Sequence, residues 1–207
     1  SYFGLQNKVQ SIAHAISMLG VEATKNLAAG FLLKKEFEER GIEFPRFWDS
    51  ASNTADLSAY IAKRLELKSP DVAFTLGLFH DVGIPLMAKK YPDYMDVLKE
   101  ANESHSELFT DIENSSYSTD HAIVATTVMF EWGISETVRN VVLYHHEFED
   151  FCFFDKSENK VQSKLLSVLK IAELGNSLMR GGVPDPDWDR FGDSITQFLG
   201  LSEDDIY

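Results

Sequence analysis

An apolar stretch that ends in a histidine and an aspartate constrains the fold more than any other part of the sequence. Ser69-Pro70-Asp71 predicts a helix start, because serine can accept a bond from an orphan amide and proline loses nothing at the first helical position. The apolar run from Val72 to Leu78 predicts that this helix is buried. Gly83 is expected to end it in the left-handed conformation, which places His80 and Asp81 in the last turn.

An imidazole and a carboxylate at a buried helix end are donors that a divalent metal site uses. The alternative is structural: His80 would interact with the negative end of the helix dipole, and Asp81 would cap a neighbouring helix. An isolated pair fits the structural interpretation better. A metal site therefore requires further donors elsewhere in the chain.

The rest of the sequence predicts helices throughout. Apolar residues recur at helical spacing and nearly every break carries a helix cap, whereas no stretch shows the sustained alternation of a strand. The other predicted helices cover residues 9–20, 22–40, 45–65, 84–90, 92–101, 105–112, 120–132, 135–144, 161–180 and 194–199. The runs 113–118 and 147–155 are expected to be loops. The fold class is therefore all-α, a compact helical bundle over residues 1–207, with residues 183–207 as a C-terminal tail that holds a short helix.

The composition limits the classes of function. The 207 residues are 44% hydrophobic, which is enough for one core, and 33 acidic against 19 basic residues give a net charge of −14. This charge opposes binding to nucleic acid or to an anionic membrane. The single cysteine, Cys152, excludes an internal disulfide and fits a reducing compartment. No apolar run approaches the roughly 20 residues of a membrane span and the N-terminus does not look like a signal peptide, so we expect a cytoplasmic protein.

Further candidate metal donors lie at other predicted helix ends. His121 falls in a first helical turn, and His145-His146 falls at the end of a helix. Glu173 lies within an apolar helix, where a carboxylate needs a partner. Donors gathered from helix ends are typical of an interior polar site in a helical bundle. His105 and His14 are expected on solvated faces instead.

The order of these residues resembles the HD superfamily of metal-dependent phosphohydrolases, and more closely the HDOD domain, its signalling relative. The matching segments are Met18-Leu19-Gly20, Phe47-Trp48, Gly77 to Gly83, Asp120-His121-Ala122, Trp132-Gly133-Ile134 and Tyr144-His145-His146. The family's usual N-terminal helical part would precede Ser1, so we expect the sequence to begin partway through the domain. The resemblance implies a metal-ligand set of His80, Asp81, His121, His145, His146 and Glu173.

Three departures from the catalytic members of the superfamily bear on the function. Ser50 stands where they carry their first histidine ligand, and a neutral hydroxyl is a poor ligand for a divalent ion. Ile84 stands where related phosphodiesterases carry a phosphate-binding lysine. The segment from Glu147 to Phe151 replaces the Gly-Tyr-Pro signature of cyclic-dinucleotide hydrolases. Two-metal cleavage of phosphoesters needs both ions and cationic help. We therefore expect no catalytic residues, and a vestigial site that holds at most one divalent ion, weakly (iron, manganese, zinc, nickel or magnesium).

The favoured hypothesis is a non-catalytic, bacterial-type signal transduction module that uses a degenerate HD-type pocket for a regulatory protein partner or a small ligand. One alternative is a metal-dependent phosphohydrolase with the reduced ligand set. Another is a structural helical domain whose histidines satisfy one another. The aromatic and acidic segment 147–155 either contacts a protein partner or folds back onto the core. Neither nucleic acid nor a membrane is expected as a partner.

Overall fold

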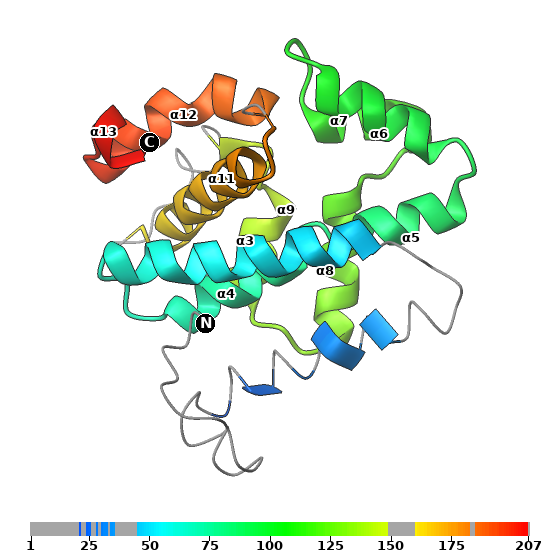
Figure 1. Ribbon diagram of the computed structural model, residues 1–207. Coiled ribbons are helices and arrows are strands. Elements are labelled where there is room, and N and C mark those ends of the chain that lie inside the picture. The colour runs from blue at the N-terminus through cyan, green and yellow to red at the C-terminus, as the bar shows by residue number, and fades with distance from the viewer. Residues whose placement is uncertain are drawn as a thin grey trace.

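The computed structural model describes residues 45–148, 160–182 and 185–206, and the isolated positions 21, 24–25, 28, 30–32 and 34–35. The predicted helix 9–20, most of 22–40 and the segment 149–155 fall outside this part of the chain. Every long element within it is a helix, so the all-α prediction is confirmed (Figure 1). The helices are α3 (Pro45–Arg64), α4 (Pro70–Phe79), α5 (Gly83–Lys90), α6 (Tyr94–Glu103), α7 (Phe109–Tyr117), α8 (His121–Glu131), α9 (Glu136–Leu143), α11 (Val161–Met179), α12 (Pro186–Leu199) and α13 (Glu203–Ile206).

The core is built where α3, α4 and α11 pack together (Figure 1). Ala51, Ala55 and Ala59 recur every four residues along α3 and are at most 3% exposed. Residues at this spacing share one face of a helix, and small side chains on that face let a neighbouring helix approach closely. A Cβ on Gly77 of α4 would lie 2.8 Å from the Cα of Ala55. The two helices therefore meet almost backbone to backbone, close to the end of α4 that precedes His80 and Asp81.

Gly83 does not end α4 as predicted. α4 ends at Phe79, and residues 80–82 form a turn. Gly83 is the first residue of α5, and its φ is not positive. Its role is close approach: a Cβ there would lie 2.8 Å from the carbonyl carbon of His121, closer still to the carbonyl oxygen, and 3.0 Å from the amide of Ala125. A glycine at this position lets the start of α5 pass against the first turn of α8.

Residues 113–118, predicted as a loop, belong largely to α7, which begins at Phe109 rather than near residue 105. Serine and asparagine favour turns locally, but contacts made on folding override that preference here. The Asn114 amide donates to the carbonyl of Thr110 at 2.9 Å and to Asp120 Oδ2 at 2.7 Å. Ser118 then ends the helix in the left-handed region, with φ of 53°.

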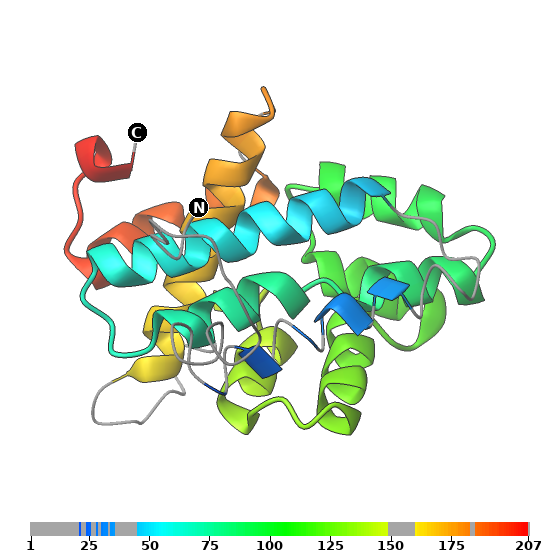
Figure 2. The same cartoon turned by 60° about the horizontal axis from the view of Figure 1, so that its bottom comes forward.

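The C-terminal segment is more ordered than the predicted short helix 194–199. α12 begins at Pro186, and the side chain of Asp185 caps it by accepting from the amide of Trp188. Trp188, Phe191 and Ile195 lie on one face of α12 and enter the core. Figures 1 and 2 show α6 and α7 at one end of the molecule and α13 at the other.

Judged by length and composition alone, one stretch, residues 70–90, is long and apolar enough to cross a membrane. This differs from the expectation that no apolar run approaches that length. It comprises α4, the turn that carries His80 and Asp81, and α5. Because 67% of its most apolar window is buried inside the protein, its hydrophobicity is explained by the core.

Candidate metal centre

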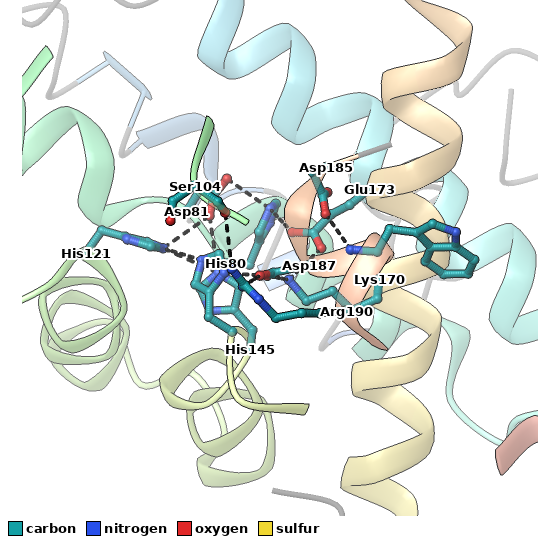
Figure 3. Close-up of polar contacts among 12 residues, drawn as sticks. His80, Asp81, Ser104, His121, His145, Lys170, Glu173, Asp185, Asp187 and Arg190 are labelled. Atoms are coloured by element: carbon teal, nitrogen blue, oxygen red, sulfur yellow. Dashed lines mark hydrogen bonds and ion pairs between the residues drawn. The ribbon is translucent and has the colours of Figure 1, made fainter. Parts of the chain in front are cut away.

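Donor atoms from separate segments meet in the interior of the protein (Figure 3). His80 and Asp81 follow α4, His121 begins α8, His145 and His146 follow α9, and Glu173 lies within α11. Asp81 is central: its Oδ1 lies 3.6 Å from His121 Nε2 and 3.4 Å from His145 Nε2, and its Oδ2 lies 3.1 Å from His80 Nε2. The structure thus brings together the six residues of the predicted ligand set, while their metal role stays a prediction.

Asp81, His121, His145 and His146 form the tighter group, called here the four-donor cluster. One possible ligand atom from each lies within 4.8 Å of the others. His121 Nε2 lies 3.4 Å from His145 Nε2 and 3.2 Å from His146 Nε2. The three histidines are buried and Asp81 is half-buried, so water has limited access to the donors.

Contacts of the far ring nitrogens place a hydrogen on Nδ1 of each of these imidazoles. His145 Nδ1 lies 2.7 Å from the carbonyl oxygen of Val142, which can only accept, so Nδ1 carries the hydrogen. Burial, together with the neighbouring His146, lowers the pKa of His145 to about 3. The ring is therefore neutral near pH 7 and presents a lone pair at Nε2.

The other two rings donate from Nδ1 to buried carboxylates. His121 Nδ1 lies 2.6 Å from Glu113 Oε2, and His146 Nδ1 lies 2.6 Å from Asp187 Oδ2. Such carboxylate–histidine pairs orient metal-bound imidazoles and raise their basicity. Both rings direct Nε2 toward the centre of the four-donor cluster.

The donor set fits one divalent metal ion. The Nε2 atoms of the three rings and a carboxylate oxygen face one another, and imidazole nitrogen and carboxylate oxygen are ligands that such an ion accepts. Three imidazoles and a carboxylate suit zinc, iron, nickel or manganese. The residues that would hold the ion are Asp81, His121, His145 and His146.

Glu113 supports the four-donor cluster and was missed by sequence reasoning. It is fully buried, and besides the His121 ring its Oε2 accepts from the backbone amide of His121 at 3.0 Å. The hydroxyl of Tyr94 donates to its Oε1. Burial alone would raise the pKa of Glu113, but the bonds from His121 lower it below its usual value, so the group is ionised. Its place in a predicted loop hid this role.

His80 and Glu173 form a second group on the other side of Asp81. His80 Nδ1 lies 2.8 Å from the carbonyl of Gly77, and its Nε2 lies 3.2 Å from Glu173 Oε1 as well as near Asp81. Burial would lower the pKa of His80, but the two carboxylates raise it to about 10. Both of its nitrogens therefore carry hydrogens, and His80 pairs with carboxylates instead of joining the four-donor cluster.

Lys170 and Asp187 complete this second group, and neither was predicted. Lys170 is 3% exposed, and its Nζ lies 2.7 Å from Asp187 Oδ2 and 3.0 Å from Glu173 Oε2 (Figure 3). Burial would raise the pKa of Glu173, but Lys170 and then His80 lower it to about 2. A signal for Lys170 existed: like Glu173, it is a charge within an apolar helix. Asp187 was hidden in the predicted tail.

A cavity of about 430 Å³ opens beside both groups. Its lining includes His80, Asp81 and Glu173, together with Ser50 and Ile84. The hydroxyl of Ser50 accepts from the side-chain amide of Asn176 at 2.8 Å, so these two residues form a neutral polar wall. The position at which the resemblance places a histidine thus faces the site without supplying a metal ligand.

The remaining sequence predictions near the site concern His105, His14 and the segment 147–155. The side chain of His105 is 68% exposed and lies 3.5 Å from Asp189, as expected for a solvated face. Phe148 is 2% exposed and packs against Phe191 with ring centroids 6.2 Å apart, so it folds back onto the core. His14 and the rest of the segment 147–155 beyond Phe148 lie outside the described residues.

Comparison with solved structures gives helical neighbours. An HDOD domain protein of unknown function from Geobacter sulfurreducens matches with a TM-score of 0.62 and 22% identity, over 97% of this chain and 69% of that one. A provisionally named phosphohydrolase from Shewanella amazonensis matches with a TM-score of 0.65 and 18% identity, over 97% and 71%. The MmoQ response regulator from Methylococcus capsulatus matches with a TM-score of 0.56 and 20% identity, over 98% and 75%. At these identities the likeness concerns the fold.

Sequence comparison gives the family. An uncharacterized protein of Treponema pallidum is 24% identical over 153 residues, which are 70% of this chain and only 28% of that relative. The chain therefore spans about a quarter of the length of the curated relative that it matches. The model of the HDOD domain matches residues 1–148, most of the chain. The chain therefore belongs to the HDOD domain family.

Proposed function

We propose that the protein is a non-catalytic signal transduction module whose four-donor cluster holds one divalent metal ion. The observation that carries the proposal is the convergence of three Nε2 atoms and Asp81 within 4.8 Å, each ring fixed from its far side. An ion there would tie the ends of α4, α8 and α9 together. Its presence would stabilise one arrangement of these helix ends, which is what a regulatory module needs.

The surroundings of the cluster support a role without catalysis. Phosphoester cleavage by two ions needs a second complete ligand set and a cation for the developing charge. Ser50 and Asn176 bond to each other where a further ligand would be needed, Ile84 offers no charge to a phosphate, and Lys170 and Arg190 in the cavity lining are paired with Asp187. The proposal includes a regulatory protein partner and a cytoplasmic location, with neither nucleic acid nor membrane as a partner, in keeping with the net charge of −14.

A metal-dependent phosphohydrolase is the second candidate. The observation that favours it is the cavity of about 430 Å³, because that space reaches Asp81 directly and could admit a small phosphate ester. In this candidate an ion held by the four-donor cluster would polarise the substrate or activate water. His80, beside Asp81, is the group that would protonate a leaving oxygen.

Metal content tests the ion that both candidates assume, and turnover separates the two. Purified protein should contain one transition metal ion per chain, and His121→Ala should lose it, while His105→Ala, at an exposed histidine, should keep it. The proposal expects no turnover by the wild type. It requires no turnover by the double variant Ser50→His, Ile84→Lys either. Hydrolysis of nucleotides or cyclic dinucleotides by the wild type, abolished by chelation and by His80→Ala, would refute the non-catalytic role.

A further inference from the structure

The two oxygens of Asp81 point into two different donor groups. Oδ1 faces His121 and His145 of the four-donor cluster, and Oδ2 faces His80. Glu173 Oε1 lies 3.2 Å from the same His80 Nε2, and Asp187 joins this second group through Lys170, whose Nζ contacts both Glu173 and Asp187. Such a set could attract a divalent ion of its own.

The ammonium of Lys170 already lies within this second group. Its Nζ is 2.7 Å from Asp187 Oδ2 and 3.0 Å from Glu173 Oε2, both distances of direct ion pairs. The lysine side chain is 2% exposed, and the carboxylates of Glu173 and Asp187 are 14% and 7% exposed. A buried ammonium is costly unless carboxylates compensate it, so this contact is part of how the site is built.

The same carboxylates also serve the neighbouring groups. Asp187 Oδ2 accepts from His146 Nδ1 and from Lys170, and its Oδ1 lies 3.3 Å from Arg190. Glu173 divides its oxygens between His80 and Lys170. A metal ion entering the second group would therefore have to displace the ammonium or bind beside it against charge repulsion, and both are unfavourable at low local dielectric.

We propose that Lys170 is a resident cation that fills the second donor group, so that the site takes one divalent ion at the four-donor cluster and no more. This inference rests on the proposed single-ion function and explains its stoichiometry. The lysine supplies a permanent positive charge where a second ion would otherwise sit. Removing that charge opens the second group, formed by His80, Asp81, Glu173 and Asp187, to another ion, which His80 binds by releasing its Nε2 hydrogen.

The test starts from metal-free protein and counts the manganese ions that it binds. Mn²⁺ is titrated into the wild type, Lys170→Met and Lys170→Gln, and into Lys164→Met, a control at an exposed lysine on the same helix. Native mass spectrometry gives the number bound, and the electron paramagnetic resonance spectrum separates isolated from neighbouring ions. We expect one ion in the wild type and the control, and one more in both Lys170 variants, with the spectrum of a coupled pair.

Several outcomes would overturn the inference. Two ions in the wild type would show that the ammonium does not fill the second group, and an unchanged count in both variants would show that it does not exclude an ion. If the Lys170 variants fold only in the presence of Mn²⁺, the number of bound ions is measured after refolding with Mn²⁺. Variants that do not refold even with Mn²⁺ would contradict the proposal. The function is judged separately, by turnover in the wild type and by whether the four-donor cluster binds any ion.

Discussion

Replacing Gly83 with alanine should destabilise the protein through backbone contact. The added Cβ would lie 2.8 Å from the carbonyl carbon of His121, 0.6 Å short of the 3.4 Å at which ordinary contact begins, and 3.0 Å from the amide of Ala125. Overpacking that side chains cannot relieve costs about 1–3 kcal/mol, and the atoms met here are backbone, so we expect about 3 kcal/mol. For a chain of this size that corresponds to a fall in Tm of roughly 6–12 °C.

Gly175→Ala is the matched control for this substitution. Gly175 lies in α11 next to Asn176, and a Cβ there meets only Leu57 Cδ1, at the ordinary distance of 3.4 Å. Alanine at an unstrained helix position should stabilise the protein by about 0.5–1 kcal/mol.

Urea unfolding followed by circular dichroism gives both values, and an unchanged m-value shows that the unfolded reference is the same. A loss below about 1 kcal/mol for Gly83→Ala would refute the close-approach role assigned to this glycine. Because the collision falls on His121, the variant should also bind metal more weakly. Retained affinity together with large destabilisation would mean that α5 moves away and α8 stays in place.

Two further predictions concern the buried network. Glu113→Ala should weaken metal binding by roughly 10–100-fold in a chelator competition, because the His121 ring loses the carboxylate that orients it, and an unchanged affinity would deny that role. The stability of the metal-free protein should be greatest near pH 6.5, the ordinary pKa of histidine. His145, whose pKa is lowered to about 3, contributes stability above pH 6.5 that is lost as the pH falls toward 3. His80, whose pKa is raised to about 10, contributes stability below pH 6.5 that is lost as the pH rises toward 10. Denaturant melts across pH test this, and a profile that stays level from pH 6.5 to 10 would contradict the ion pairing of His80.

Sequence reasoning located the residues whose positions depend on local signals. Caps and breaks placed His80, Asp81, His121 and the pair His145-His146 at helix ends, and helix ends do converge in this bundle. The convergence itself came from the resemblance, since spacing along the chain does not give distances between helices. Glu173 was recognised because a carboxylate in an apolar helix needs a partner, and it has two.

The residues that were missed depend on contacts made only in the folded protein. Glu113 lies in a run of residues that favour turns, and its helix is held by bonds to Asp120 and to α8 that local propensity does not report. Asp187 follows the cap of α12, yet its partners Lys170 and His146 are 17 and 41 residues away. Gly83 was assigned to the wrong purpose because glycine serves both left-handed turns and close approach, and the choice depends on what lies opposite.

The separation of the cluster residues along the chain has a kinetic consequence. His121 and His145 lie 24 residues apart, with α8 and α9 between them, and α5 to α7 separate Asp81 from His121, so an ion bound to all three cross-links segments that are distant along the chain. Such a cross-link opposes the departure of each segment while the others remain in place, in the way that a clip across a loop restricts the open chain. An ion of this kind binds the assembled protein and not the open chain, so its main effect would be to slow unfolding. The half-life of the folded domain, more than its shape, would then depend on how much metal the cell supplies.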